Sequence, residues 1–550
     1  MDPSDFAAAR GLWQALLGRS RVLDAAVATR RYGVDTSGTG HAPSAVLLIN
    51  DRSELGPILE VARRHRIPLY PISTGRNWGY GGASPVVDNC VVVDLSGMDR
   101  IVELDPELGL VTLEPGVTQG QLREYLDRHA PQFMVPTTGA GPNCSLVGNA
   151  LERGYGITPH TDHFGAVTAL EAILADGSVY RSPLAELGAE IANRAFKWNI
   201  GPYVDGLFAQ GNIGIVTQMT LALAPRPERV EAFFFSIPDT DKLQTAVLAV
   251  RGILRTLGST VGAVNLMNAR RILAMTAPYP EQFRGGNTIL PEEVLLALSR
   301  HHQVRAWMGV GALYGSDRVV RAARRVVRQL VRPASDRIVF MTPEHSAFLG
   351  RLLRVLPGLR DSRPAKLLAA ARQSLDIMAG QPNEVALALA YWRTGLRPAN
   401  VSLDPARDGC GLIWYSPLVP MTASAVGNYV AMVDGVCRAH RIEPLITLTS
   451  LTDRCFDSTV PLLFDRADAQ EMARANACFD ALYEAGQGQG FVPYRLGINA
   501  MTRVTSVPST FWNLVATIKS TVDPDGIIAP GRYVPLPVSA TRPPRATPME

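Results

Sequence analysis

Three glycine-rich segments, each beside a run of strand-forming residues, constrain the fold of this chain more than any other feature. They are residues 74–85 (TGRNWGYGGASP), 139–156 (GAGPNCSLVGNALERGYG) and 211–216 (GNIGIV). Glycine lets the backbone adopt positive φ and approach a ligand closely, and clustered backbone N–H groups favour an anion. The three segments therefore predict loops gathered around one extended anion or cofactor.

The residues before the first glycine-rich segment predict a β-α-β unit. An apolar run at 45–49 is followed by a helix that opens at Ser53 and Glu54, and then by a second run at 68–72. Two parallel strands joined by a helical crossover are therefore expected. The other elements predicted from hydrophobic periodicity are strands at 90–95, 101–104, 110–114 and 217–223 and a helix at 118–128.

From about residue 225 the pattern becomes mainly helical. In residues 316–330 four arginines repeat at helical spacing, which indicates a solvated helix face and not a nucleic-acid site. Residues 356–408 are rich in Arg, Pro and Ala, and we interpret them as containing a long loop. The four arginines are Arg318, Arg321, Arg325 and Arg328.

Length and composition set the class of protein. A chain of 550 residues predicts two or more domains, and 47% hydrophobic with 19% charged residues is typical of a globular protein. The net charge of +4 is too small to indicate a nucleic-acid partner. Six scattered cysteines without a CxxC pair predict neither a zinc site nor a disulfide framework. With no basic leader and no long apolar stretch, we expect a soluble cytoplasmic protein without a membrane or metal partner.

Common nucleotide-binding and hydrolytic motifs are absent from the sequence. A Rossmann fold needs GxGxxG between its first strand and helix, and no segment has that spacing. The P-loop, HExxH and GxSxG signatures are missing as well. NAD bound through a Rossmann turn, phosphoryl transfer, zinc hydrolysis and serine-esterase chemistry are therefore disfavoured.

Six sequence blocks, in collinear order between about residues 41 and 534, resemble the vanillyl-alcohol oxidase and p-cresol methylhydroxylase family of flavoproteins. Together they are specific, although one glycine loop alone is not. The blocks are PISTGRNWGYGGASP (71–85), VTLEPGVTQGQL (111–122), VGNALERGYGITPHTDHFG (147–165), IGPYVDGLFAQGNIGIVTQ (200–218), PYRLG (493–497) and VDPDGIIAPGR (522–532).

The resemblance implies an α+β, two-domain p-cresol methylhydroxylase-like FAD-binding fold with an α/β cap domain over the substrate. The implied FAD-binding domain comprises residues 1–228 and a C-terminal return at 496–535, with the cap at 229–495. We expect residues 536–550 to be a disordered tail. A homodimer is an option, and oxygen and a redox protein both remain open as electron acceptor.

The resemblance also implies which residues bind FAD. Backbone amides of residues 74–83 would hold the pyrophosphate. The implied cofactor-binding residues are Ser73, Thr74, Gly75, Arg76, Asn77, Gly79, Gly81, Gly82, Gly148, Asn149, Arg153, Gly154, Gly156, Asp162, Gly214, Ile215, Val216, Arg495 and Arg532.

Four residues match the catalytic positions of the family. Tyr80, Tyr494 and Arg495 correspond to a phenol-binding trio, in which two hydroxyls and a guanidinium stabilise a phenolate. Asp162 matches an acid that relatives place near the flavin, where a carboxylate stabilises charge or acts as a base. Its alternative role is that of a turn residue. His160 and His163 are interpreted as hydrogen-bonded loop histidines and not as metal ligands.

Two departures from the family pattern affect the cofactor link and the pocket. Where relatives attach FAD through histidine this chain has Leu412, and where they use tyrosine the alignment gives Ala390. Non-covalent FAD is therefore favoured, with Tyr391 and His41 as the remaining candidates for attachment. Where relatives often carry a His-His pair, the cap wall reads Cys455, Phe456 and Asp457, so we expect a different side chain on the substrate.

The function implied is abstraction of hydride by FAD from the benzylic carbon of a para-substituted phenol through a quinone methide. We extend this to oxidative decarboxylation of a tyrosine-derived natural-product precursor to a styrene-type product. Such an acidic substrate needs a second cation beyond Arg495, for which Arg393 or another cap arginine is a candidate. Two alternatives stay open: a sugar or 2-hydroxy-acid oxidase or dehydrogenase of the same fold, and a non-catalytic flavin-binding protein.

Overall fold

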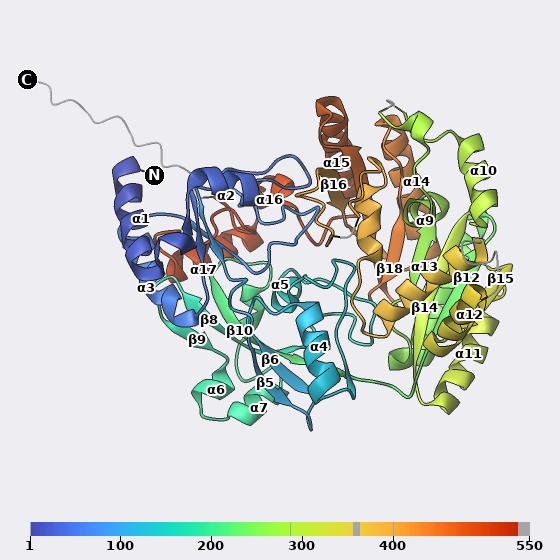
Figure 1. Cartoon of the computed structure of the whole chain (residues 1–550), viewed down its shortest axis with the longest axis horizontal. Helices are drawn as coiled ribbons and strands as arrows, with labels where there is room; N and C mark the ends of the chain where they lie inside the picture. The colour runs from blue at the N-terminus through green and yellow to red at the C-terminus, as the bar shows by residue number, and fades with distance from the viewer. Residues whose placement is uncertain (1, 286–287, 356–362, 400, 537–550) are drawn as a thin grey trace, which may run out of the picture.

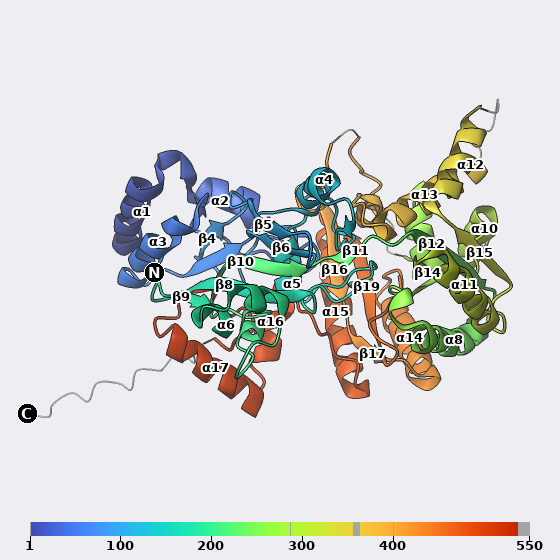
Figure 2. The same cartoon turned by 90° about the horizontal axis from the view of Figure 1, so that it is seen from below.

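The computed structural model describes residues 2–285, 288–355, 363–399 and 401–536. Two small sheets built from the first half of the chain lie on one side of the molecule, and one large sheet from the second half lies on the other (Figures 1 and 2). The predicted tail lies outside the described residues beyond Leu536.

The first sheet has four strands in the order β1-β2-β4-β3. Strands β2 and β3 both pair in parallel with β4, so the predicted β-α-β unit is present but its strands are not neighbours. Apolar side chains of β2 and β4 are buried, as the sequence predicts for a covered sheet. The elements are β1 (Val22–Leu23), β2 (Ala45–Leu48), α3 (Leu55–Arg64), β3 (Leu69–Ile72) and β4 (Val91–Asp94).

The second sheet is antiparallel, with the strand order β5-β6-β10-β8-β9. The helix predicted at 118–128 is present as α4 (Gln119–His129), and Thr118 and Gln121 form a capping box at its start. The third glycine-rich segment leads directly into β10. The other elements here are β5 (Ile101–Asp105), β6 (Leu110–Leu113), α5 (Leu146–Leu151), β8 (Val167–Leu174), β9 (Val179–Arg181) and β10 (Gly214–Ala222).

The third sheet has eight strands and forms the cap. Its path is β15-β12-β14-β13-β18-β19-β16, with β17 also paired to β19. The strands are β12 (Arg229–Ile237), β13 (Asn265–Asn268), β14 (Trp307–Gly315), β15 (Arg337–Met341), β16 (Cys410–Tyr415), β17 (Leu418–Pro420), β18 (Thr447–Ser450) and β19 (Cys455–Asp465).

Helices cover both faces of the cap sheet. Helices α8 (Leu243–Leu257), α11 (Asp317–Val331) and α14 (Ala423–Ala439) pack on one face, where Phe233 and Phe235 are buried. Helices α9 (Ala269–Thr276) and α13 (Arg363–Met378) pack on the other. The basic stripe of α11 is exposed while Val320, Ala323 and Val327 are buried, which confirms a solvated helix face.

The long loop predicted within 356–408 is present in its second part, where residues 392–399 and 401–409 form no helix or strand. Earlier in that segment, α13 and the short helix η7 (Val385–Tyr391) take the place of loop. Residues 356–362 and 400 lie outside the described residues. The remaining elements are α1 (Pro3–Leu17), α2 (Ala25–Tyr32), β7 (Phe133–Met134), α6 (Pro183–Glu186), α7 (Glu190–Ala195), β11 (Ala224–Pro225), α10 (Glu292–His302) and α12 (Pro343–Val355).

The C-terminal segment crosses back from the cap to the first sheet. After α15 (Ala469–Gln489) and α16 (Ile498–Thr505), helix α17 (Thr510–Val522) lies on the same side of the molecule as α1 and α3 in both views (Figures 1 and 2). The Leu69 N–H donates to the Ile527 carbonyl at 2.7 Å, and the Ala529 N–H donates to the Leu69 carbonyl at 2.7 Å. The division of the chain into domains stays our proposal, and this return supports it.

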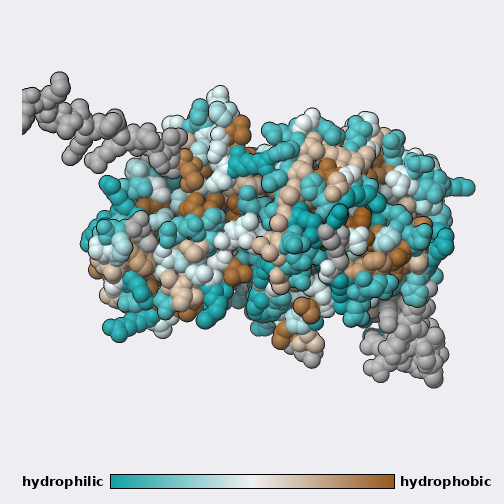
Figure 3. Space-filling model, turned by 90° about the horizontal axis from the view of Figure 1, so that it is seen from above, coloured by the Kyte–Doolittle hydropathy of each residue, from teal (hydrophilic) through white to brown (hydrophobic). Residues whose placement is uncertain are grey.

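The surface carries hydrophobic residues in small groups among hydrophilic ones on the face shown in Figure 3. Among the described residues, no helix is long and apolar enough to cross a bilayer.

Candidate active site

A cavity of about 420 Å³ lies where the glycine-rich loops meet the cap. Residues from β3, α5 and β10 line one side, and residues from β16, β19 and the segment before α16 line the other. Most residues predicted from the sequence to bind cofactor or substrate are on its wall. These are Ser73, Thr74, Gly75, Arg76, Asn77, Tyr80, Gly81, Gly82, Gly148, Asn149, Gly214, Ile215, Val216, Tyr494, Arg495 and Arg532.

Five predicted site residues are not on the cavity wall. Gly154 and Gly156 lie behind it, where a side chain would collide with Asn149 or His163. The Asn149 amide contacts His163 Nδ1 at 2.5 Å, and burial lowers the pKa of His163 to about 4, so this histidine is neutral. These two glycines therefore hold Asn149 in place instead of facing a ligand. The others are Gly79, which lies under Trp414, and the exposed Arg153 and Asp162.

Two glycines clamp the loop that carries Tyr80. Gly79 has φ +80° and Gly81 has φ +122°, a backbone conformation that favours glycine. A Cβ at Gly79 would overlap the Trp414 indole, and one at Gly81 would lie 2.5 Å from Ile498. The Trp414 N–H donates to the Gly79 carbonyl at 3.3 Å, and the Ile498 N–H donates to the Tyr80 carbonyl at 3.1 Å. Tyr80 is thus fixed between the cap and the C-terminal return.

The three residues of the predicted phenol-binding trio lie together. The Arg495 guanidinium carbon is 4.3 Å from the centroid of the Tyr80 ring, and Arg495 also donates to the Asn77 side chain. The Tyr80 hydroxyl contacts Ser416 Oγ at 2.6 Å, and the Tyr155 ring packs edge-on against Tyr494 with centroids 5.9 Å apart. Burial raises the pKa of Tyr80 to about 12 despite the opposing effect of Arg495, so both tyrosines are hydroxyl donors at neutral pH.

A buried carboxylate, Glu152, joins two arginines behind the trio. Arg532 forms an ion pair with Glu152 Oε1, and Arg495 Nε lies 3.6 Å from Glu152 Oε2. Burial alone would raise the pKa of Glu152, but Arg532 and Arg495 hold it below its usual value. Glu152 therefore stays ionised and fixes both guanidinium groups. Its place next to Arg153 in the second glycine-rich segment is the one sequence signal that pointed to this residue.

Asp457 is the second carboxyl group on the cavity wall, and sequence reasoning gave it no catalytic role. It lies on β19, is 6% exposed, and its Oδ1 has no hydrogen-bond partner among the described residues. Burial raises its pKa to about 7, although Arg495 and a hydrogen bond from Tyr494 act in the opposite direction. Phe456 faces the hydrophobic core on the other side of the sheet. Successive side chains of a strand point to opposite faces of the sheet. This alternation was the sequence signal that could have shown that Asp457 and Phe456 face different surroundings.

Asp162, the predicted catalytic acid, lies in an exposed turn. Its Oδ1 accepts a 2.7 Å hydrogen bond from the Gly165 N–H, which is the geometry of the turn aspartate considered from the sequence. It does not line the cavity. Of the two aspartates, the one that the cavity encloses is Asp457.

The candidates for covalent attachment and for a second cation also lie off the cavity wall. The Tyr391 hydroxyl donates to Asp408 at 2.7 Å, and His41 lies 3.3 Å from Asp88, whereas Ala390 and Leu412 do line the cavity. Arg393 forms a buried ion pair with Glu471 at 2.6 Å.

The described residues fit FAD. Glycine backbone lines the cavity beside Arg532 and Arg495, which suits an anionic pyrophosphate and a flavin ring that becomes negative on reduction. A Cβ at Gly148 would lie 3.0 Å from Ser73 Oγ, so the wall has no room for a larger residue there. Arg495 Nε is buried without a hydrogen-bond partner in the described part of the chain. No group of three or more His, Cys, Asp or Glu among those residues could hold a metal ion.

Known proteins resemble this chain over nearly its whole length. Residues 43–182 match the family described as "FAD binding domain". The chain is 36% identical to the 1'-carboxy-chondrochloren decarboxylase of Chondromyces crocatus over 524 residues, 95% of this chain and 96% of that protein. It is 30% identical to the 4-cresol dehydrogenase (hydroxylating) flavoprotein subunit of Pseudomonas putida over 532 residues, 94% of each. The crystal structure of p-cresol methylhydroxylase with substrate bound matches with a TM-score of 0.86 and 27% identity, covering 97% of this chain and 98% of that one.

Proposed function

The chain belongs to the vanillyl-alcohol oxidase and p-cresol methylhydroxylase family of FAD-dependent oxidoreductases, and on this premise we propose that it oxidises a para-substituted phenol at the benzylic carbon. The observation that carries the proposal is that Tyr80, Tyr494, Arg495 and Asp457 share the wall that the glycine-rich loops also line. Tyr80 and Asp457 are buried, and Tyr494 and Arg495 are half-buried.

When bound, FAD supplies the acceptor for a hydride. Backbone of the first and second glycine-rich segments and the guanidinium of Arg532 would hold it. Since neither Tyr391 nor His41 is on the cavity wall, we propose that FAD is held without a covalent bond. Acid precipitation should then release all of the flavin, and the mass of the polypeptide should equal that of the chain alone. A precipitate that stays yellow would contradict this.

The trio activates the phenol. Two hydroxyl donors and the Arg495 guanidinium stabilise negative charge on the phenolic oxygen, because a buried cation interacts more strongly than one in water. Asp457, with a pKa near 7, is placed to take the phenolic proton through the Tyr494 hydroxyl. The phenolate then pushes electrons through the ring, the benzylic C–H bond breaks with both electrons leaving as hydride, and a neutral quinone methide forms.

The fate of the quinone methide decides the product. The relative from Chondromyces crocatus is named a decarboxylase, and we extend the proposal to that outcome. A carboxylate on the carbon next to the benzylic one would leave as CO2. The electrons of the broken C–C bond would form the alkene while the ring regains its phenolate. Two electrons have then gone to the flavin and the phenolic proton to Asp457, so the reaction balances.

Anaerobic single-turnover mixing tests the proposal. We expect 4-ethylphenol to bleach the flavin absorption band and its methyl ether, which cannot ionise, to leave the band unchanged. Tyr494→Phe and Arg495→Lys should each slow bleaching by about 100-fold, the effect of losing one well-placed donor. Equal rates for the phenol and its ether, or bleaching by lactate or a hexose instead, would contradict the proposal.

A further inference from the structure

Arg271 is a buried cation on the cavity wall for which the described residues provide no acid. It lies on α9, is 8% exposed, and lines the cavity. Its Nε donates to Thr447 Oγ1 at 2.9 Å. Its Nη1 is buried and has no hydrogen-bond partner, and no carboxylate pairs with it, in the part of the chain that the structure describes.

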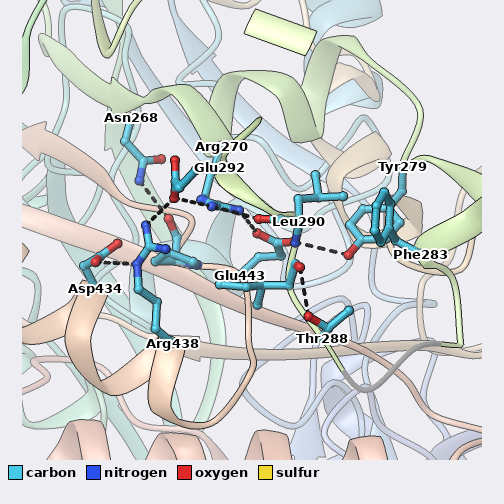
Figure 4. A network of polar contacts seen from close by, with 12 residues as sticks. Asn268, Arg270, Tyr279, Phe283, Thr288, Leu290, Glu292, Asp434, Arg438 and Glu443 are labelled. Carbon is cyan, nitrogen blue, oxygen red and sulfur yellow. Dashed lines mark hydrogen bonds and ion pairs between the residues drawn. The ribbon is translucent and has the colours of Figure 1, made fainter. Parts of the chain in front are cut away.

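The neighbouring arginine shows the contrast. Arg270 pairs with Glu443 at 2.5 Å and with Glu292 at 2.8 Å, and it also donates to the Leu290 carbonyl (Figure 4). Asn268 caps α9 by accepting from the Arg271 N–H at 3.0 Å. The start of α9 is thus held firmly, and the two successive arginines point to different surroundings.

Burying a cation without a counter-charge costs free energy, so we expect another group to balance the charge of Arg271. Burial lowers the pKa of Arg271 to about 10, so it still carries its charge at neutral pH. The Trp414 ring, with its centroid 5.9 Å from the guanidinium carbon, is the aromatic neighbour. One cation–π contact at that distance offsets only part of the desolvation cost of a guanidinium. An anionic ligand group would supply the missing partner.

The sheet register places Arg271 close to the proposed reaction centre. Thr447 on β18, which holds the guanidinium, is paired directly with Thr459 on β19. Thr459 lines the cavity and points to the same face of the sheet as Asp457, two residues away. That separation is roughly 7 Å along the strand. Arg271 therefore faces the same enclosed space as Asp457, displaced along the sheet.

We infer that Arg271 binds a carboxylate on the para side chain of the substrate, so that the substrates of this enzyme are 4-hydroxyphenyl compounds with an acidic side chain. Guanidinium presents paired N–H donors that match a carboxylate, and here Nη1 is free to donate. The inference rests on the proposed function, since it assumes that the phenol oxygen lies at Tyr80, Tyr494 and Arg495. It assigns to Arg271 the role that sequence reasoning offered to Arg393 or another cap arginine.

A binding measurement tests the inference without any turnover. The probe is 4-hydroxyphenoxyacetate, which has a phenol and a carboxylate but an ether oxygen in place of the benzylic carbon. Its neutral control is 4-hydroxyphenoxyacetamide. For the FAD-loaded enzyme we expect the acid to bind more tightly than the amide. Arg271→Met should weaken binding of the acid by about 10- to 100-fold and leave the amide nearly unaffected, and Arg271→Lys should recover part of the loss.

The control variant is Arg318→Gln, which removes an exposed arginine of α11 far from the cavity. It should change the dissociation constant of neither the acid nor the amide. Flavin absorbance and circular dichroism of each variant establish that it is folded and loaded. If Arg271→Met, folded and loaded, binds acid and amide as the wild type does, the inference is wrong.

A reactive substrate separates this inference from the proposed function. With 3-(4-hydroxyphenyl)propanoate we expect bleaching of the flavin and release of CO2 with 4-vinylphenol, and Arg271→Met should raise the concentration needed for half-maximal rate. If no phenol bleaches the flavin, the proposed function fails, whatever the binding data show. If 4-ethylphenol bleaches the flavin, but Arg271→Met binds and oxidises the acid as the wild type does, only the carboxylate subsite is disproved.

Discussion

Asp457 is the carboxyl group that the cavity encloses, and its surroundings predict how flavin reduction depends on pH. The ionised form accepts the phenolic proton in our proposal, and its pKa is about 7. The rate should therefore rise as pH increases through about 7 and level off above it. Asp457→Asn should remove this rise and lower the rate by about 100-fold, a usual loss for a general base. Stopped-flow reduction by 4-ethylphenol between pH 5 and about 9 measures both effects.

Asp162→Asn is the matched comparison for that experiment, because the family resemblance implies a catalytic role for Asp162 and the structure places it in an exposed turn. We expect its pH profile to keep the rise near neutrality. A flat profile for Asp162→Asn together with a normal one for Asp457→Asn would return the role to Asp162.

The same carboxyl group affects stability, with a sign that follows from the raised pKa. Burial favours the protonated form of Asp457, while in the unfolded chain the group ionises near 4. The folded protein therefore loses stability as pH rises from about 4 to about 7, by roughly 4 kcal/mol in total, and no further above that. Asp457→Asn cannot ionise, so its free energy of unfolding relative to wild type should increase over that range. Denaturant titrations of the flavin-free proteins at several pH values measure the difference in free energy of unfolding between Asp457→Asn and the wild type. A difference that does not grow as pH rises would contradict the prediction.

At the scale of elements, the loop that carries Tyr80 depends on two glycines. Gly81→Ala adds a Cβ that meets Ile498 and forces a residue at φ +122°, so we expect a loss of stability of about 2 to 3 kcal/mol and weaker FAD retention. Gly177→Ala is the control, because Gly177 has φ +85° but nothing within 4 Å of the added atom. Gly177→Ala should lower the free energy of unfolding by about 1 kcal/mol and leave the flavin content unchanged. Equal losses from the two variants would show that the contact with Ile498 is not important.

Local pattern predicted the elements better than their arrangement. The β-α-β unit at 44–72 and the helix at 118–128 follow from short-range periodicity, and both are present. That β4 lies between β2 and β3 depends on long-range pairing, which periodicity does not report. The loop predicted within 356–408 covers less of that segment than its composition indicates, because Arg and Ala also favour helices, and α13 uses them.

The candidate site shows the same difference between residues that local motifs predict and residues whose role depends on long-range packing. Tyr80, Tyr494 and Arg495 were predicted because their short motifs are distinctive, and the structure brings all three to one cavity. Asp457 was named only as part of the cap wall, and Arg271 was not singled out, because neither lies in a distinctive motif. Their significance comes from burial and from the partners they have or lack, which only the packing of the cap sheet against α9 determines.

At the scale of the whole molecule, the cavity is assembled from segments that the cap separates in the sequence, so its integrity depends on the C-terminal return. Lys519 on α17 joins that return to the third glycine-rich segment. Its buried ammonium donates to the Asn212 carbonyl at 2.6 Å and to the Ile528 carbonyl at 2.8 Å, and it pairs with Asp523. Asp523 in turn accepts from the Ile528 N–H at 2.8 Å.

Lys519→Met should therefore destabilise the protein by about 3 to 5 kcal/mol, because it leaves the Asp523 carboxylate buried without its cation. Since Asn212 lies beside the cavity residues 214–216, FAD should also dissociate more readily. Denaturant unfolding and the release of flavin fluorescence on dilution measure the two effects. Lys242→Met, the same change at an exposed lysine, is the control and should shift neither. Adding Asp523→Asn to Lys519→Met should recover part of the stability, because the unpaired charge is then removed. A double variant no more stable than Lys519→Met would mean that the two carbonyl contacts, and not the ion pair, hold the C-terminal return against the glycine-rich loop.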